Sequence, residues 1–426
     1  MQATRRLLLA SAAILAACGA AAIAKGPTST SDARNGFSEA RLANLEAYIR
    51  NDIDKGLIPG ATITVVKGDK VVFQKFLGVR DAATKQPMTA DTIFRIYSMT
   101  KPITTVAAMM LVEEGRLALE DPVAKHLPEF KDVKVGVEKP DASGKPSLEL
   151  VAPRRPMTVH DLMRHTSGLT YGFFGEGLVK KSYVEANLGA GDPTTAEFVK
   201  RLAALPLVYQ PGTTWDYSQS TDVLGRIIEV VSGQTLLQFM KERILDPLGM
   251  KDTSFYVTEK DKHDRIAEPL PNDRAIGAGA QVNDPRQVRN YESGGGGLVS
   301  TTADYQRFLQ MLLNGGALDG KRYLSPKTIE TMAANHIGPA AGVQPGPYYL
   351  PGPGYGFGLG FAVRTETGAN GATSSVGEYY WGGAAGTAFW VDPKENLFVL
   401  YMMQSPSQRV RFRPALRNMV YGAIER

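Results

Sequence analysis

Cysteine and histidine are scarce in this chain, and their scarcity argues against two common kinds of site. The single cysteine, Cys18, cannot form a disulfide within one chain. The histidines are scattered and match no spacing typical of metal ligands; they are His126, His160, His165, His263 and His336. We therefore expect no metal site and no cofactor.

Concentrated basic charge is also lacking. Lys and Arg number 48 against 43 Asp and Glu, a formal net charge of +5, but these residues are spread along the chain. No basic block and no alternation of basic with aromatic residues occurs, so we expect no nucleic-acid partner. The pattern G-x-S-x-G is absent as well, which argues against the nucleophile turn of an α/β-hydrolase.

The first hydrophobic run is too short to span a bilayer stably. It extends from Leu7 to Ala17 after a pair of arginines, which is typical of a signal peptide. The sequence L-A-A-C at 15–18 matches the lipobox of bacterial lipoproteins, in which the cysteine is lipidated and becomes the N-terminus. Cleavage after Ala24 is the alternative and would discard Cys18. We favour lipidation because the only cysteine lies where it requires one, and in both cases we expect export, either to the periplasm or as a lipoprotein anchored to the envelope membrane.

Strand-like segments gather near the two ends of the chain. A helix is predicted over 38–57, followed by strands at 61–66 and 70–76 joined by a Gly-Asp turn. Strands return at 358–364, 387–391 and 397–402, before a closing helix at 409–425. This order predicts an α/β fold in which one antiparallel sheet is built from both termini and flanked by helices, with an inserted all-helical domain.

The predicted domain organisation follows from these segments. We assign 1–24 to the signal peptide, 25–36 to a linker, 37–100 with 285–426 to the α/β domain, and 101–284 to a mainly helical domain. A capping box at Thr158 predicts a short helix ending at Gly168, and a further capped helix is predicted over 301–314. The charged, proline-rich stretch 131–156 is predicted to be a surface loop.

Ser98 and Lys101 form the pattern S-x-x-K directly before the apolar run 103–112. In a helix this spacing puts hydroxyl and amine on one face about one turn apart, so the amine could take the hydroxyl proton during nucleophilic attack. Each residue alone has a simpler explanation, Ser98 as a helix N-cap and Lys101 as a solvated lysine. The apolar flanking residues favour the burial that a lysine base needs.

Two further segments could complete such a site. Tyr217 lies in a turn-rich loop before a helix, where its phenol could shuttle a proton; alternatively it is a half-buried aromatic whose hydroxyl bonds to nearby backbone. The segment Trp-Gly-Gly-Ala at 381–384 precedes an apolar strand, and its glycines would let a substrate approach the backbone. The N–H groups of Ser98 and Ala384 could then form an oxyanion hole, although a Gly-Gly pair alone is more often a turn.

In combination these segments resemble the serine β-lactamase and penicillin-binding-protein superfamily, which carries S-x-x-K, Y-x-N and K-T-G in that order. The corresponding segments are Ser98 to Lys101, Tyr217 to Gln219 and Trp381 to Gly383. Replacement of K-T-G by W-G-G is the pattern of the family VIII carboxylesterases. The resemblance extends over nearly the whole mature chain. It implies an α/β domain, an all-α domain and an active site in the cleft between them.

The resemblance also implies roles for individual residues. Ser98 would be the nucleophile, with Lys101 and Tyr217 as general base and acid. Substrate-binding positions would be Trp381, Gly382, Gly383 and Gln219. Gln219 departs from the asparagine of many members, and Trp381 replaces a lysine that elsewhere helps hold the carboxylate of a β-lactam. Because an indole carries no positive charge, neutral esters should gain relative to anionic lactams.

We therefore expect an exported bacterial serine esterase whose partner is a small-molecule, short-chain carboxylic ester. Side activity on β-lactams such as cephalosporins remains open, because nucleophile and base are unchanged. The alternatives on the same fold are a β-lactamase or D-alanyl-peptide hydrolase, an acyltransferase, and a non-catalytic envelope binding protein. His165, near the end of a short predicted helix, is expected to be a structural hydrogen-bonding residue.

Overall fold

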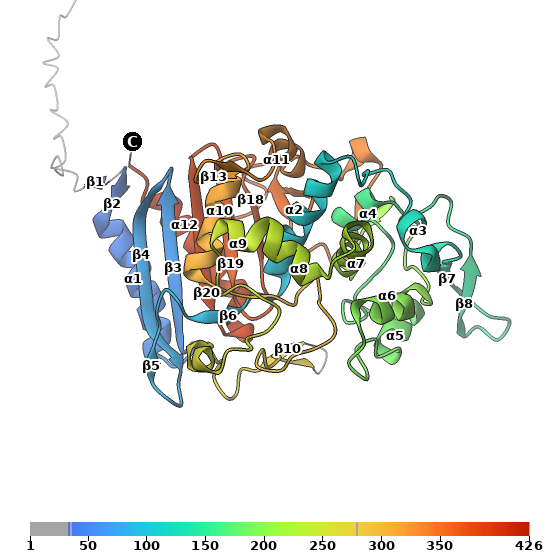
Figure 1. Ribbon diagram of the computed structural model, residues 1–426, viewed down its shortest axis with the longest axis horizontal. Coiled ribbons are helices and arrows are strands. Elements are labelled where there is room, and N and C mark those ends of the chain that lie inside the picture. The colour runs from blue at the N-terminus through green and yellow to red at the C-terminus, as the bar shows by residue number, and fades with distance from the viewer. Residues whose placement is uncertain (1–32, 35, 278–279, 426) are drawn as a thin grey trace, which may run out of the picture. The chain divides into compact units, whose positions relative to one another are not determined.

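The computed structural model describes residues 33–34, 36–277 and 280–425 and is shown in Figure 1. The predictions for the signal peptide, Cys18 and most of the 25–36 linker fall outside these residues. Within the described part of the chain, none of the helices combines the length and apolar character needed to cross a membrane.

A large antiparallel sheet joins the two ends of the chain, as predicted. The strand order is β16-β17-β18-β19-β20-β3-β4-β5, and Leu397 lies opposite Lys67 where β20 pairs with β3. Strands from the two chain ends therefore lie side by side in Figure 1. The strands are β3 (Gly60–Lys67), β4 (Lys70–Asp81), β5 (Gln86–Pro87), β16 (Tyr355–Phe357), β17 (Ala362–Arg364), β18 (Tyr379–Gly382), β19 (Ala388–Asp392) and β20 (Leu397–Met403).

Helices cover both faces of this sheet. On β19, the Phe389 ring contacts Tyr305 of α10 (Thr302–Leu313), whereas Trp390 lies beneath the guanidinium of Arg417 in α12 (Arg409–Gly422). Successive strand residues point to opposite faces, so α10 and α12 lie on opposite sides of the sheet. The N-terminal helix α1 (Glu39–Asp54) packs against α12. Because both faces are covered, β3 and β20 are buried along almost their whole length.

Helix α2 (Thr100–Glu113) connects the sheet to the inserted helices. Its residues from Thr100 to Leu111 are all buried, and it packs against α7 and α8. A helix that is apolar all round must be covered on every side, and α2 is therefore central to the molecule. The other inserted helices are α3 (Val123–His126), α4 (Val159–Met163), α5 (Leu178–Glu185), α6 (Thr195–Ala203), α7 (Ser220–Ser232), α8 (Leu236–Met240) and α9 (Asp246–Leu248).

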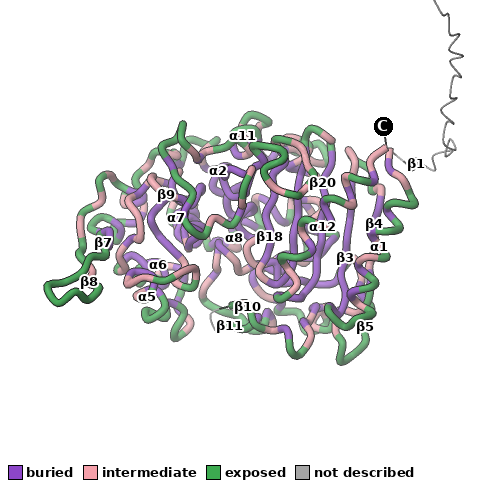
Figure 2. Tube along the Cα trace, turned by 180° about the vertical axis from the view of Figure 1, so that it is seen from behind, coloured by how far each residue is buried: buried purple, intermediate pink, exposed green. Residues whose placement is uncertain are grey.

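Three local predictions are corrected by the structure. The stretch 131–156 contains an antiparallel hairpin of β7 (Val135–Pro140) and β8 (Pro146–Val151), whose tip is largely exposed in Figure 2. Of the strand predicted over 358–364, only β17 (Ala362–Arg364) forms, because residues 358–361 make the turn that joins it to β16, with Gly360 at φ +90°. The helix that opens on the Thr158 capping box ends at Met163, before Gly168.

The remaining regular elements are short. Beyond α10 and α12, the C-terminal half contains helix α11 (Pro326–Met332). Strands of two or three residues form small two-stranded pairs. The antiparallel pair of β6 (Ile93–Arg95) and β12 (Val299–Thr301) lies next to the predicted nucleophile. The others are β1 (Ala33–Arg34) with β2 (Phe37–Ser38), β10 (Ala275–Gly277) with β11 (Ala280–Gln281), β13 (Ala317–Leu318) with β14 (Lys321–Arg322), and the parallel pair β9 (Thr214–Trp215) with β15 (Gln344–Pro345).

Candidate active site

Ser98 lies in a tight turn between β6 and α2. The turn is a single 3₁₀ segment, Tyr97–Met99, and Tyr97 has a φ of +42°. A bulky residue in this region costs about 1–3 kcal/mol and needs support from its surroundings. Asn283 provides it, because its side-chain oxygen accepts from the Tyr97 hydroxyl at 2.7 Å and its N–H donates back at 3.0 Å. The strained turn leaves Ser98 only partly buried.

The side chain of Ser98 does not cap helix α2, so the N-cap explanation of this serine is wrong. The N-cap residue is Met99, without a side-chain bond. Among the described residues, the hydrogen-bond partner of the Ser98 hydroxyl is Lys101, whose Nζ lies 3.5 Å from Oγ. The spacing is long for a hydrogen bond, but contacts between catalytic groups often shorten when substrate binds.

Lys101 is completely buried, so it is not a solvated helix lysine. Its Nζ donates to the carbonyl of Gly295 at 2.6 Å and to the Tyr171 hydroxyl at 3.3 Å. The amine also lies 4.6 Å from the centre of the Tyr217 ring and 5.5 Å from that of Tyr171. One backbone carbonyl and two aromatic rings thus fix the amine beside Ser98.

Tyr217 reaches the same place from the loop between β9 and α7. It is buried among His165, Trp215 and Trp381. Its hydroxyl accepts a hydrogen bond from Nε1 of Trp381 at 3.2 Å. In the described residues the phenol oxygen is hydrogen-bonded to neither Ser98 nor Lys101, so the ring faces the amine while the hydroxyl points to the indole.

The segment 381–384 approaches Ser98 at the end of β18. A Cβ on Gly383 would lie 2.4 Å from the carbonyl oxygen of Ile96, two residues before Ser98. Glycine is therefore required for the strand to come this close to the turn. The N–H of Ala384 has no hydrogen-bond partner among the residues described. It is free to bind an oxyanion, as is the Ser98 N–H at the start of its 3₁₀ turn.

Gln219 stands at the start of α7, where it is the N-cap residue. Its backbone carbonyl accepts from the N–H groups of Asp222 and Val223. Its side-chain oxygen Oε1 is buried without a hydrogen-bond partner in the described part of the chain. An unpaired buried acceptor is costly, and a donor group on a bound ligand would satisfy it.

Tyr171 and Asp222 also belong to the surroundings of Lys101, and the sequence had not singled them out. Burial raises the pKa of Tyr171 well above its usual value, with the charge of Asp222 as the next cause, so the phenol next to Lys101 stays protonated. Asp222 accepts from the hydroxyls of Tyr291 and Ser293, both at 2.6 Å, and from the Gly295 N–H at 3.1 Å. It thereby holds the backbone that presents the Gly295 carbonyl to Lys101. No local pattern marked either residue, because each acts through a contact distant in sequence.

His165 has the structural role expected for it. Its ring is buried between Trp215, Tyr217 and Phe357, and Nδ1 lies 3.2 Å from the Ser218 hydroxyl. Burial, with the nearby Lys101 charge, holds the pKa of His165 well below its usual value. A neutral, packed imidazole at this position supports the Tyr217 ring.

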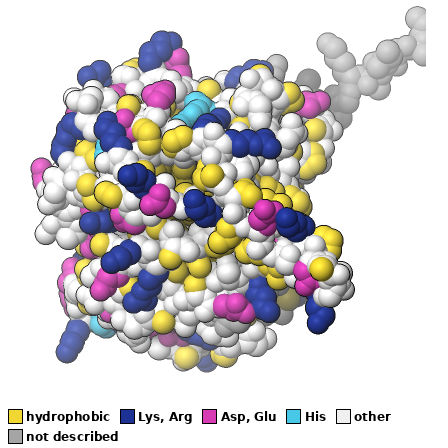
Figure 3. Space-filling view, turned by 90° about the vertical axis from the view of Figure 1, so that its right-hand side faces the viewer, with side chains coloured by type: hydrophobic (Ala, Val, Ile, Leu, Met, Phe, Trp, Pro, Cys, Tyr) yellow, Lys and Arg dark blue, Asp and Glu magenta, His cyan; other side chains and the backbone are white. Residues whose placement is uncertain are grey.

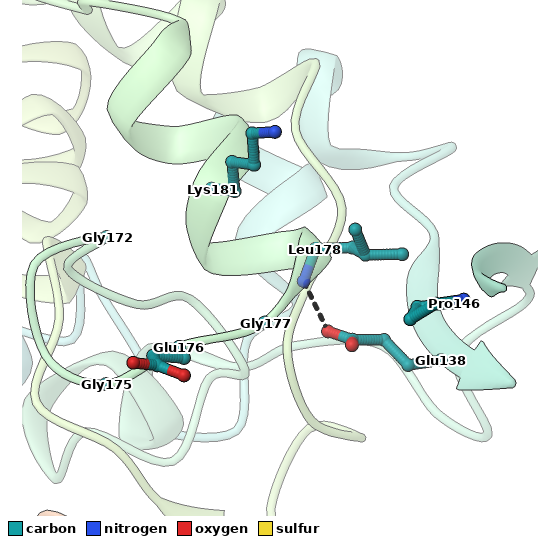
Figure 4. Close-up of a pocket in the computed structure, with 8 residues that line it drawn as sticks. All are labelled: Glu138, Pro146, Gly172, Gly175, Glu176, Gly177, Leu178 and Lys181. Carbon is teal, nitrogen blue, oxygen red and sulfur yellow. Dashed lines mark hydrogen bonds between the residues drawn. The ribbon is translucent and has the colours of Figure 1, made fainter.

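Two cavities lie apart from the predicted site residues. One of about 410 Å³ is bounded by the β7–β8 hairpin and the start of α5, where Glu138 accepts from the Leu178 N–H at 2.6 Å (Figure 4). The second, of about 450 Å³, shares Glu138 and Glu176 with the first and is also lined by Lys180, Tyr209 and Tyr348. Side chains of both charges are interspersed on this end of the molecule (Figure 3), without a continuous basic patch on the face shown.

Comparison with known proteins places this arrangement in a family. The chain matches the Beta-lactamase family model over residues 45–421. It is 39% identical over 368 residues to Protein Rv1367c of Mycobacterium tuberculosis, covering 84% of this chain and 89% of that protein. It is 32% identical over 401 residues to Esterase EstB of Burkholderia gladioli, covering 89% and 95%.

The fold is similarly matched. The solved structure of EstCE1, described as a hydrolase with promiscuous acyltransferase activity, superposes with a TM-score of 0.75 at 27% identity, covering 90% of this chain and 99% of that one. The resemblance and the fold class predicted from the sequence are confirmed. The chain is a serine hydrolase of the β-lactamase fold, and it belongs to the family VIII esterases of the serine β-lactamase and penicillin-binding-protein superfamily.

Proposed function

We propose that this protein is a carboxylesterase that hydrolyses short-chain esters through an acyl-enzyme on Ser98. The observation that carries the proposal is the fully buried Lys101 amine 3.5 Å from the Ser98 hydroxyl. The Ala384 N–H, which has no hydrogen-bond partner among the described residues, adds a free donor in the segment that approaches the Ser98 turn. This combination offers a nucleophile, a proton acceptor held against it, and a donor for a developing oxyanion.

In the proposed acylation step, Ser98 Oγ attacks the ester carbonyl carbon while its proton moves to the Lys101 amine. The carbonyl oxygen becomes negative and binds the N–H groups of Ser98 and Ala384. The carbon–oxygen bond to the alcohol then breaks, and the alcohol leaves with a proton supplied by the pair Lys101 and Tyr217. Water repeats the sequence on the acyl-enzyme, which releases the carboxylic acid and restores the serine.

The hydrogen bond from Trp381 to Tyr217 suits the departure of the alcohol, which needs a proton. The indole can only donate, so the phenol oxygen accepts from it and keeps its own proton available for another acceptor. We propose that this proton moves to the departing alcohol once substrate lies between Ser98 and Tyr217. The Lys101 amine, which lies over the Tyr217 ring and by then carries the proton taken from Ser98, would pass that proton to the phenolate.

The similar proteins support an ester substrate. EstB carries the name of an esterase, and EstCE1 is described as a hydrolase with promiscuous acyltransferase activity. Acyl transfer to an alcohol is therefore the second candidate, since it differs from hydrolysis only in the acceptor of the acyl group.

Initial rates on 4-nitrophenyl butyrate and on a chromogenic cephalosporin test the main proposal. We expect the wild-type protein to cleave the ester much faster than the lactam, and the Ser98→Ala variant to cleave neither. A fluorophosphonate probe should label the wild type with one equivalent at Ser98. Full ester hydrolysis by the Ser98→Ala protein would remove the mechanism, and a cephalosporin rate above the ester rate would favour a β-lactamase.

The same substrate separates hydrolase from acyltransferase. Adding a primary alcohol at increasing concentration should leave the release of 4-nitrophenol little changed while butyric acid remains the main product. If the alkyl butyrate instead becomes the main product at millimolar alcohol, the acyl-enzyme is built for transfer, and the second candidate replaces the first.

A further inference from the structure

The loop formed by residues 171–177 carries Tyr171 into the candidate active site, yet it has few attachments to the rest of the molecule. Its first N–H, that of Tyr171, donates to the Tyr217 carbonyl at 3.2 Å. Among the residues described, the backbone of 172–176 bonds to groups outside the loop through one atom, the carbonyl oxygen of Phe174. The three glycines of the loop line the cavity of about 410 Å³ (Figure 4), so this side of the loop is not packed.

Lys180 of α5 provides the attachment at Phe174. The residue is only 5% exposed. Its Nζ donates to the Phe174 carbonyl and lies 3.4 Å from Oδ1 of Asp216. The centre of the Tyr348 ring is 5.3 Å from the same nitrogen. One buried ammonium therefore joins the loop to the residue that directly precedes Tyr217.

Asp216 anchors this ammonium beside the site. Its own N–H donates to the His165 carbonyl at 3.0 Å. Its carboxylate is buried, and within the described part of the chain Lys180 is its one ion-pair partner. Burial raises the pKa of Asp216, and the Lys180 charge acts against this rise. Because desolvation offsets most of the attraction in a buried ion pair, stability alone does not explain the pair.

The side chains of the loop connect its position to the reacting groups. The ring centres of Tyr171 and Phe174 lie 5.3 Å and 5.9 Å from that of Tyr217. The Tyr171 hydroxyl lies 3.3 Å from Nζ of Lys101. A shift of the loop would move this phenol away from the amine, and small displacements of groups around a reacting centre lower the rate strongly.

We infer that Lys180 is a positioning residue for the proposed reaction, whose ammonium holds loop 171–177 against Asp216 so that the Tyr171 hydroxyl stays beside Lys101. The inference rests on the proposed esterase function. An ammonium suits this role because it has three donors, enough for a carbonyl and a carboxylate at once. A loop with three glycines needs such a tether, since glycine leaves the backbone free to adopt many other conformations.

A double-variant cycle tests this role. For Lys180→Met we expect kcat for 4-nitrophenyl butyrate to fall about 10-fold with little change in KM. In the Tyr171→Phe background, the same substitution should lower kcat by less than about two-fold, because the contact that Lys180 positions is already lost. Losses that multiply in the double variant would show that Lys180 acts on another group and would overturn the inference.

Lys181→Met is the matched control. Lys181 is the next residue of α5, and its exposed side chain pairs with Glu185 at 3.6 Å. This variant should keep kcat within about two-fold of wild type. Thermal unfolding of each variant checks folding, and Lys180→Gln carries the same test if the methionine variant does not fold, because its amide has no charge to hold Asp216. A wild-type kcat in whichever of the two folds contradicts the inference.

Hydrogen exchange without substrate separates this inference from the proposed function. We expect Lys180→Met to speed exchange in the peptide 170–177 by about 10-fold or more, with α10 and the Lys181→Met protein unchanged. Unchanged exchange in 170–177, or an equal rise in α10, overturns the positioning role even if Ser98 is the nucleophile. The esterase proposal fails separately, if Ser98→Ala leaves ester hydrolysis unchanged.

Discussion

At the scale of single residues, the complete burial of Lys101 is the feature that most needs an explanation. A lysine that is completely buried and donates to one carbonyl and one phenol is held in a single position. Packing of this kind is costly for a long, flexible side chain that ends in a polar group. A residue that only stabilised the fold would not need it, so the cost points to a role in chemistry.

We predict that Lys101→Ala lowers kcat for 4-nitrophenyl butyrate by about 10³-fold or more, because nucleophile and base act as a unit. Lys101→Arg should be nearly as inactive, since a guanidinium keeps a positive charge but cannot accept a proton. Steady-state kinetics on folded variants measures both. Substantial activity in the arginine variant would show that charge, and not proton transfer, is what Lys101 contributes.

Tyr171 should act as a positioning residue for Lys101. Tyr171→Phe removes the hydroxyl 3.3 Å from Nζ but keeps the ring. We predict a fall in kcat of about 10-fold with little change in KM, the effect of one lost polar contact on the base. Tyr209→Phe, a loop tyrosine lining the second cavity, is the control and should be silent. A rise in KM at constant kcat would assign Tyr171 to substrate binding instead.

At the scale of elements, the approach of β18 to the Ser98 turn depends on one glycine. In Gly383→Ala the new methyl group would lie within 2.4 Å of the Ile96 carbonyl, so strand and turn must separate. Oxyanion-hole donors act only when correctly placed, and losing one costs about 10²–10³ in kcat. We predict a loss of that order with a modest fall in Tm.

Gly189→Ala is the control for Gly383→Ala, because a Cβ on Gly189 would meet nothing within 4 Å. It should leave both kcat and Tm near the wild-type values. Near-normal activity in Gly383→Ala would mean that the oxyanion hole is formed elsewhere.

The helical region and the sheet meet at a pair of histidines, His160 of α4 and His336 after α11. Their ring nitrogens Nε2 and Nδ1 lie 3.0 Å apart. Burial lowers the pKa of His160 to about 4, helped by the charge of Arg164, and burial also lowers that of His336. In the unfolded chain both titrate near 6.5.

Between these values the unfolded state binds more protons than the folded one, so stability rises with pH. The contribution is complete above about pH 6.5 and is lost as the pH falls toward 4. We predict that His160→Gln flattens the pH dependence of the free energy of unfolding by about 2 kcal/mol over this range, allowing for partial solvent screening. Urea unfolding at several pH values measures it, with His263→Gln as control. An unchanged slope would contradict this assignment.

At the scale of the whole molecule, the attachment of the protein to the envelope is a proposal that rests on residues 1–24 alone. We predict that the full-length chain incorporates labelled palmitate in a bacterial host and that Cys18→Ala abolishes this labelling. Membrane fractionation would then find the variant in the soluble envelope fraction. Labelling that persists in Cys18→Ala would exclude the lipobox, whereas a soluble, unlabelled wild type would favour cleavage after Ala24.

Much of the fold could be predicted because its signals are local. The hairpin at 61–76 and the capping box at Thr158 depend on neighbouring residues, and the structure forms strands and a helix there. The prediction of a surface loop over 131–156 was wrong because it also relied on local composition alone. Charged and proline residues concealed a hairpin whose exposed strands bury little apolar surface.

By itself, then, the sequence determined the family, the sheet built from both chain ends, and the three segments that approach one another at Ser98. Only the tertiary structure decided which atoms meet there. The Gly295 carbonyl and the Tyr171 hydroxyl hold the Lys101 amine, and Asp222 fixes the backbone beneath it. The physical reason is that spacing along the chain fixes contacts within one turn or one hairpin. Contacts between residues on different elements, far apart along the chain, are set by how those elements pack.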